Sequence, residues 1–112
     1  MRLVGTVRLL VQNALWRATG WATAGRALLR TLGSDDEDLR SLAGMFLVQA
    51  GPRAEPLLRE ALVRRESLPL VLTILGDIGD RRVAPDLLNF TRDDDPKVAE
   101  AAREALRLLN AH

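Results

Sequence analysis

Two runs of acidic residues are the part of this sequence that could hold a metal ion. They are residues 35–38 and 93–95. A calcium loop needs a glycine at its sixth position and a glutamate at its end, and neither run continues in that way. Each run precedes a helical pattern, and negative charge is favourable at a helix N-terminus. We therefore interpret both runs as helix caps and expect no metal site.

The residues that usually carry out catalysis are scarce in this chain. Cysteine and tyrosine are absent, and the single histidine is His112. A disulfide framework, a thiolate metal site and a cysteine nucleophile are therefore excluded. No phosphate-binding glycine loop, nucleophile elbow or zinc-protease motif occurs. We expect no catalytic residues, no cofactor and no enzymatic activity.

Charge is unevenly distributed along the chain, although its net value is only +1. Of its sixteen basic residues, eleven follow residue 30, and so do all fifteen acidic residues. A net acidic remainder argues against tracking of phosphates, so we expect no nucleic-acid partner. Residues 1–30 instead contain basic residues and no acid, which indicates an anionic neighbour for this segment: Arg2, Arg8, Arg17, Arg26 and Arg30.

The N-terminal segment could also be a targeting sequence. It lacks a compact apolar region with a small-residue cleavage site, and no apolar run approaches the ~20 residues that span a bilayer. We interpret it as a retained structural helix, with a targeting role as the alternative.

The periodicity of apolar residues predicts an all-α protein. At 112 residues with 47% hydrophobic content, the chain is long enough for one domain with a modest core. The fifth predicted helix has no charge between Ser67 and Gly76, so we place it in the middle of the domain. The predicted helices cover residues 3–18, 21–32, 35–50, 52–65, 68–78, 82–92 and 97–110.

The first predicted helix has apolar residues on two sides. Leu9 and Trp16 lie seven residues apart on the narrower side, which we expect to be exposed and to contact a partner protein or an anionic membrane. The broader side should face the core. Its residues are Leu3, Val4, Val7, Leu10, Val11, Ala14, Leu15 and Ala18.

Several helix boundaries can be predicted from local chemistry. Ser34 and Glu37 have the spacing of a capping box. Gly79 should end the fifth helix in a left-handed conformation, and Asp80 should cap the next helix, which has Pro85 in its first turn. Asp95 is the expected N-cap of the last helix, with a proline following it.

The sequence contains an internal repeat. Residues 46–51 correspond to residues 74–79 at a shift of 28, and residues 56–62 correspond to residues 85–91 at a shift of 29. Leu39 corresponds to Val98 two repeats later. A period near 30 with two helices per unit is typical of a helical solenoid.

The corner at residues 75–88 resembles the corner between two HEAT repeats, in the short-repeat group known from phycobilisome lyase-like proteins. The resemblance implies a single domain over residues 1–112, an α-solenoid of about three HEAT-like hairpins (21–51, 52–79 and 80–110) with an N-terminal capping helix (1–19). It also implies a structural ion pair involving Asp77 and Arg82. An ordinary helical bundle is the alternative architecture.

The resemblance also bears on function. HEAT-like lyases that attach bilins are longer and act as heterodimers, and HEAT-like DNA glycosylases hold DNA in a basic groove that this chain lacks. We therefore expect a non-catalytic protein–protein interaction module, a bacterial and cytoplasmic scaffold, adaptor or accessory subunit. The alternatives are an accessory or chaperone subunit of a lyase-type complex, and a peripheral adaptor attached to the inner membrane through residues 1–30.

The repeat register predicts a partner-binding groove along the second helices of the repeats. Small or apolar side chains would line its first two units, and carboxylates would line its last. An amphipathic helix or extended segment with a basic flank is the expected ligand, and coverage by another copy or an adjacent subunit is the alternative. The groove residues are Met45, Val48, Thr73, Gly76, Glu100 and Glu104.

Overall fold

The computed structural model describes residues 3–19 and 22–111 of the chain, and in these residues it is helical with no strand. The prediction of an all-α protein is therefore confirmed. The chain divides into two compact units, residues 1–57 (unit 1) and residues 58–112 (unit 2). The predicted repeat boundaries within a single domain remain a prediction.

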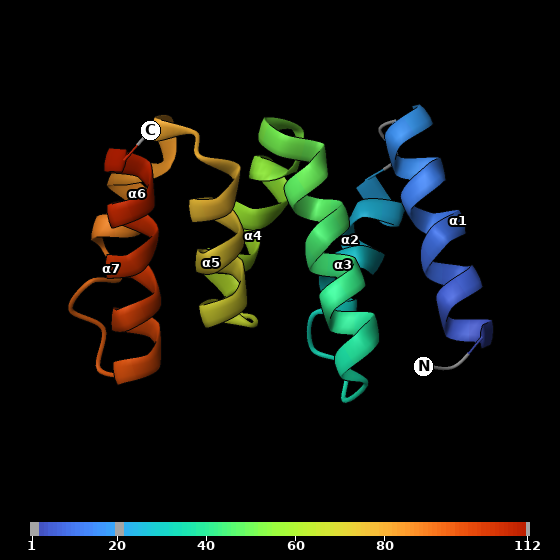
Figure 1. Ribbon diagram of the computed structural model, residues 1–112, viewed down its shortest axis with the longest axis horizontal. Coiled ribbons are helices and arrows are strands. Elements are labelled where there is room, and N and C mark those ends of the chain that lie inside the picture. The colour runs from blue at the N-terminus through green and yellow to red at the C-terminus, as the bar shows by residue number, and fades with distance from the viewer. Residues whose placement is uncertain (1–2, 20–21, 112) are drawn as a thin grey trace. The chain divides into compact units, whose positions relative to one another are not determined.

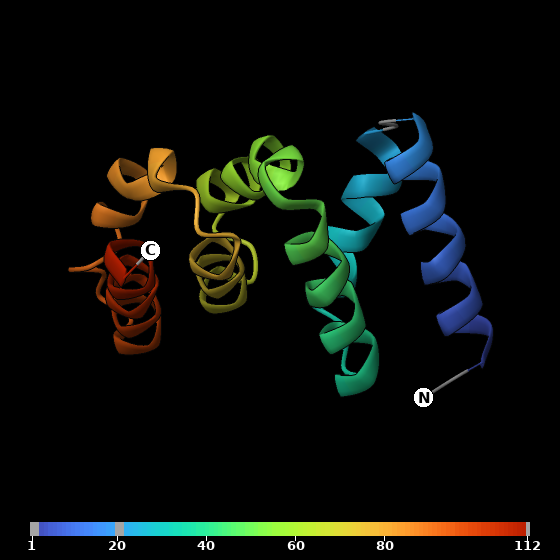
Figure 2. The same ribbon diagram turned by 45° about the horizontal axis from the view of Figure 1, so that its top comes forward.

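Unit 1 is built from three helices and a short connection. Helix α1 (Leu3–Thr19) packs on both α2 (Ala22–Thr31) and α3 (Glu37–Ala50), as Figure 2 shows. The 3-10 helix η1 (Gly51–Ala54) then leads into α4 (Glu55–Arg64), in which the boundary between the units falls. The core of unit 1 includes buried aliphatic and aromatic side chains: Leu28, Leu32, Ala43, Phe46 and Leu47.

Unit 2 is organised around α5 (Leu68–Ile78). Helix α7 (Pro96–Ala111) lies beside α5 and also packs on α6 (Ala84–Leu88), which follows the 3-10 helix η2 (Arg81–Val83) (Figure 1). Most of the circumference of α5 is buried, as its lack of charge predicted. The buried residues of α5 are Leu68, Val71, Leu72, Ile74, Leu75 and Gly76.

A glycine sets the distance between α5 and α7. A Cβ atom added at Gly76 would lie 2.8 Å from the Cα of Ala105 and 2.9 Å from its Cβ. These distances are shorter than van der Waals contact, so only glycine allows the two backbones to approach so closely. The small-residue stripe of α7, with Ala102 and Ala105 both buried, fits the same close packing.

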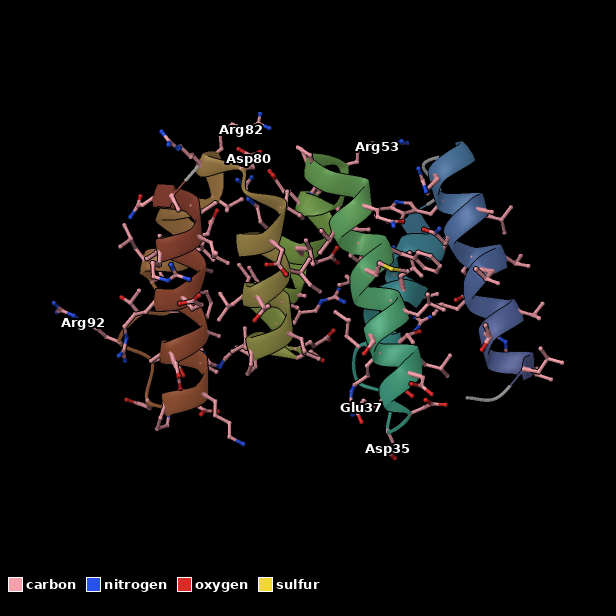
Figure 3. The ribbon with its side chains drawn as sticks, viewed as in Figure 1. Asp35, Glu37, Arg53, Asp80, Arg82 and Arg92 are labelled. Atoms are coloured by element: carbon pink, nitrogen blue, oxygen red, sulfur yellow. The ribbon has the colours of Figure 1, made fainter. Side chains whose placement is uncertain are left out.

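The corner after α5 has the predicted caps. Gly79 has φ 77° and its N–H donates to the carbonyl of Leu75, while the Asp80 carboxylate accepts from the N–H of Arg82 at 3.0 Å. The predicted ion pair of Asp77 and Arg82 is wrong, because Arg82 instead pairs with Asp80 at 2.7 Å (Figure 3). The shorter separation along the chain lets the cap and the ion pair share one carboxylate.

The predicted capping box before α3 is also wrong in detail. Asp36, not Ser34, is the N-cap, and its Oδ1 accepts from the N–H groups of Asp38 and Leu39 at 3.0 and 3.3 Å. The hydroxyl of Ser34 accepts from the N–H of Asp36 at 3.1 Å, which shapes the loop before the cap. Among competing acceptors, the carboxylate adjacent to the helix therefore takes the cap.

The predicted helix at 82–92 is much shorter in the structure. After α6, the N–H groups of Phe90 and Thr91 donate to carbonyls three residues earlier, Leu87 and Leu88. The hydroxyl of Thr91 donates to the same Leu88 carbonyl at 2.9 Å. Helix α6 therefore ends four residues before the predicted boundary. The turns after it are tighter than an α-helix, and the Thr91 hydroxyl competes for a backbone carbonyl.

The turn between α4 and α5 contains two non-glycine residues with positive φ, Arg65 at 57° and Ser67 at 48°. Ser67 is the N-cap residue of α5 but makes no side-chain cap bond. The guanidinium of Arg65 pairs with Asp93 at 3.0 Å, joining this turn to the loop before α7. The N–H of Asp95 and then the Arg65 guanidinium hold the pKa of Asp93 below its usual value.

We expect Gly76→Ala to destabilise the protein although alanine favours helix formation. The added methyl group meets the backbone of α7, so the helices must move apart, at a cost of about 1–3 kcal/mol. Urea unfolding followed by circular dichroism measures the change. Thr73→Ala, on the exposed side of the same helix, is the control; equal stability of both variants would show that the close approach is unimportant.

Leu72→Ala should remove a larger share of the stability. Leu72 is fully buried, so its truncation should cost about 2–5 kcal/mol through lost transfer energy and the cavity that remains. Val63→Ala, at a side chain that is 85% exposed, should stay within about 0.5 kcal/mol of wild type. Equal free energies of unfolding for Leu72→Ala and Val63→Ala would contradict the central position of α5.

Candidate partner-binding surfaces

The two sides of α1 are reversed relative to the prediction. Leu9 is 2% exposed and Trp16 is 6% exposed, so neither can form the predicted surface stripe. Both face the rest of unit 1. A Cβ atom added at Gly25 of α2 would lie 3.0 Å from Nε1 of Trp16 and would overlap Leu57. The missing side chain of Gly25 therefore provides the space that Trp16 and Leu57 occupy.

A glycine in the next helix could have predicted this orientation, which the spacing of apolar residues in α1 alone does not. A glycine in the interior of an amphipathic helix costs about 1 kcal/mol relative to alanine, so it usually has a packing reason. Gly25 is such a residue, and a large aromatic side chain is the partner that needs its space. Counting apolar residues assigns the core-facing role to the aliphatic side of α1, because that side has more of them. The single tryptophan on the other side has less weight in such a count, although it is the residue that is buried.

The side of α1 opposite Leu9 and Trp16 is an exposed aliphatic surface, here called the outer face of α1. The exposed fraction of its side chains ranges from 78% at Leu3 to 39% at Leu15. Contiguous exposed apolar surface on a folded protein commonly marks an interaction site. The outer face consists of Leu3, Val4, Val7, Leu10, Val11 and Leu15.

Arginine residues border the outer face. Arg8 and Arg17 are exposed, and neither side chain has a hydrogen bond or ion pair within residues 3–19 and 22–111. The backbone carbonyl of Arg17, near the end of α1, accepts from Arg53 at 3.3 Å. A further cation thus lies at the negative end of the helix dipole. In the described part of the chain, no helix is long and apolar enough to cross a membrane.

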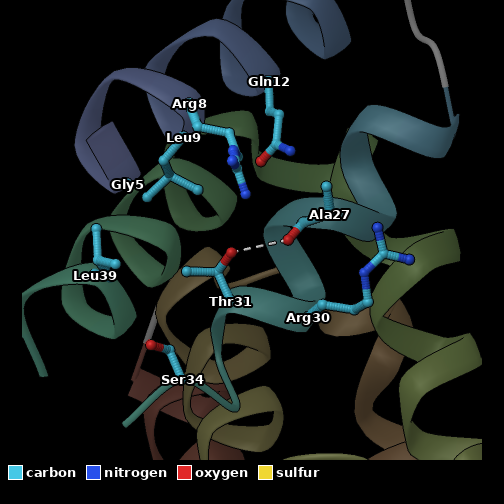
Figure 4. A pocket seen from close by; sticks show the side chains of 9 residues that line it. All are labelled: Gly5, Arg8, Leu9, Gln12, Ala27, Arg30, Thr31, Ser34 and Leu39. Atoms are coloured by element: carbon cyan, nitrogen blue, oxygen red, sulfur yellow. Dashed lines mark hydrogen bonds between the residues drawn. The ribbon is translucent and has the colours of Figure 1, made fainter. Parts of the chain in front are cut away.

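A pocket of about 300 Å³ lies between α1 and α2. Arg8 and Gln12 extend into it from α1, whereas Thr31 and the guanidinium of Arg30 lie on opposite sides of α2 (Figure 4). The Thr31 hydroxyl is already used, because it donates to the carbonyl of Ala27 at 2.9 Å. A neighbouring hollow contains two carboxylates and shares Ser34 and Leu39 with the pocket. The surroundings therefore carry both signs of charge.

The acidic runs serve as caps and links in the structure. Asp36 caps α3, Asp95 accepts from the N–H of Lys97 at 2.9 Å, and Asp93 accepts from Asp95 and Arg65. Within the described residues, no group of three or more histidine, cysteine or acidic side chains is arranged to hold a metal ion. These carboxylates are thus occupied by nearby N–H groups and by an arginine.

The predicted groove residues fall in both units and are described separately. In unit 1, Met45 of α3 is 46% exposed and Val48 is half-buried. In unit 2, Thr73 is exposed and its hydroxyl donates to the carbonyl of Pro69 at 2.8 Å. Gly76 is buried against Ala105, so its predicted role in admitting a partner backbone is wrong. The backbone that Gly76 admits belongs to α7.

Exposed residues of α5 and α7 form one surface in unit 2, here called the α5·α7 face. The helices run in the same direction (Figure 1) and meet at Gly76 and Ala105, so the exposed sides of both lie on the same side of the pair. Helix α5 contributes Leu70, Thr73 and Asp77, and α7 contributes Lys97, Glu100, Glu104 and Arg107.

The charges of the α5·α7 face are only partly compensated. Arg107 donates to Glu104 at 2.9 Å, and this pairing lowers the pKa of Glu104. Asp77 and Glu100 have no hydrogen-bond or ion-pair partner for their side chains among the described residues. Within the part of the chain that the structure describes, the face therefore offers two unpaired carboxylates and one unpaired cation, Lys97, beside the half-exposed Leu70.

Comparison with known proteins gives no match to a protein-family model, a curated protein or a solved structure.

The reversed orientation of α1 can be tested by substitution on its two sides. Trp16→Ala should destabilise the protein by about 3–5 kcal/mol, because it empties a buried site. Val7→Ser, at a side chain that is 50% exposed, should change stability by no more than about 0.5 kcal/mol. Urea unfolding measures both variants. The opposite order of the two effects would restore the orientation expected from the sequence.

Proposed function

We propose that this chain is a non-catalytic protein-binding module, built as an α-solenoid of HEAT-like hairpins. The parallel packing of α5 on α7, which lie about one repeat period apart, supports this architecture. Binding to a segment of another protein is the function that the surface chemistry of unit 2 favours. A scaffold or adaptor with such a surface needs neither a cofactor nor a catalytic residue.

The observation that carries the proposal is the α5·α7 face. Its uncharged side chains are Leu70 and Thr73 of α5, and its carboxylates that are unpaired among the described residues are Asp77 on α5 and Glu100 on α7. An apolar side chain of a partner can cover Leu70, while basic side chains pair with the carboxylates. The partner is therefore an amphipathic helix or extended segment that carries basic residues beside its apolar ones.

Two synthetic helical peptides test this proposal. Both have the same leucine positions, and one carries lysines where the other carries glutamates. Fluorescence anisotropy should show that the full chain binds the lysine peptide more tightly than the glutamate peptide. Asp77→Asn combined with Glu100→Gln should weaken binding of the lysine peptide by about 2–30-fold, since an exposed ion pair contributes roughly 0.2–1 kcal/mol.

A matched control removes a carboxylate elsewhere in unit 2. Glu60 of α4 pairs with Arg64 at 2.9 Å and lies outside the α5·α7 face, so Glu60→Gln should leave the affinity unchanged. Equal binding of both peptides, or equal weakening by the control variant, would mean that the α5·α7 face is not the binding surface.

A further inference from the structure

We propose that α1 lies on the surface of an anionic phospholipid bilayer, with its outer face among the lipid chains. This site is separate from the α5·α7 face and uses only residues of unit 1. It would attach the protein to a membrane without a spanning helix. The proposal rests on the exposed aliphatic side chains of α1, their arrangement on one side and the charges that border them.

The outer face has the geometry of a helix that lies in a membrane interface. At 100° per residue, its six aliphatic side chains fall within an arc of about 140°. The helix has 17 residues and is therefore about 25 Å long, so it can lie flat along a bilayer surface. The inner side of the same helix is already held by α2 and α3.

The charges border the outer face on both edges. At the same angular spacing, Arg8 falls about 20° beyond Leu15 on one edge, and Arg17 falls about 20° beyond Leu10 on the other. The Arg8 side chain points into the pocket between α1 and α2, and rotation out of this pocket lets its guanidinium group reach a lipid phosphate. The stems of both arginines can then lie along the edges of the apolar surface. Both arginines are exposed and unpaired within the described residues.

Charge complementarity favours a bilayer over a second copy of this chain. Residues 1–34 contain no acidic side chain, so two outer faces placed together would supply arginines and no carboxylates. The outer face combines aliphatic side chains with a cation on each edge. An anionic membrane has the complementary arrangement, in which an apolar layer is bordered by negatively charged headgroups.

Vesicle flotation tests the proposal with the full chain. The vesicles contain phosphatidylcholine alone, or phosphatidylcholine with an equal amount of phosphatidylglycerol. Wild-type protein should float with the anionic vesicles. Arg8→Gln with Arg17→Gln should lower the partition coefficient by about 25-fold, at roughly fivefold per arginine. Val7→Ser with Val11→Ser should lower it by about tenfold or more.

Matched variants in unit 2 control for general effects of charge and hydrophobicity. Arg81→Gln with Arg92→Gln removes two exposed arginines, and Val63→Ser with Leu88→Ser removes two exposed aliphatic side chains. Both double variants should float like wild type. Failure of wild type to bind anionic vesicles would overturn the proposal, as would equal losses in the unit 2 variants.

A labelling experiment locates the contact without removing the aliphatic surface. Because the chain has no cysteine, Val7→Cys and Val63→Cys each give one attachment point for an environment-sensitive fluorophore. Emission from position 7 should shift to shorter wavelength when anionic vesicles are added, and emission from position 63 should not. A blue shift at position 7 without vesicles that disappears on dilution would instead assign the outer face to self-association and overturn the proposal.

Discussion

The contact between Gly76 and Ala105 determines the arrangement of unit 2. Because no side chain separates the two backbones, α5 and α7 lie at a distance that a Cβ atom would not permit. The aliphatic residues on the rest of α5 are then covered, and the exposed side chains of both helices lie on one side. The α5·α7 face is therefore a consequence of close helix packing.

Unit 1 uses a glycine for a different purpose. Gly25 leaves space for the indole of Trp16, which fixes the inner side of α1 and leaves its aliphatic side outward. One large aromatic contact thus determines the orientation of a helix that has apolar residues on two sides. An exposed aliphatic surface remains because a single helix cannot bury both of its apolar sides against the same two neighbours.

Local chemistry in the sequence predicted the helical class, most of the helix boundaries and the caps at Gly79 and Asp80, since these depend on residues close together in the chain. The orientation of α1 and the role of Gly76 could not be predicted in that way. Both depend on which distant residue provides space, Gly25 in one case and Ala105 in the other. The predicted binding residues failed where they required this information (Leu9, Trp16 and Gly76), while Thr73, Glu100 and Glu104 are exposed as expected.

The turn between α4 and α5 places two opposing effects on one residue. Arg65 adopts a backbone conformation that favours glycine, at a cost of about 1–3 kcal/mol, and its side chain pairs with Asp93. A glycine at this position would relieve the backbone and lose the link to Asp93. The balance changes in acid. As the pH falls through the lowered pKa of Asp93, the carboxylate is protonated and the link weakens, while the backbone conformation of Arg65 keeps its cost. The ion pair between Arg65 and Asp93 therefore stabilises this turn only where Asp93 is ionised.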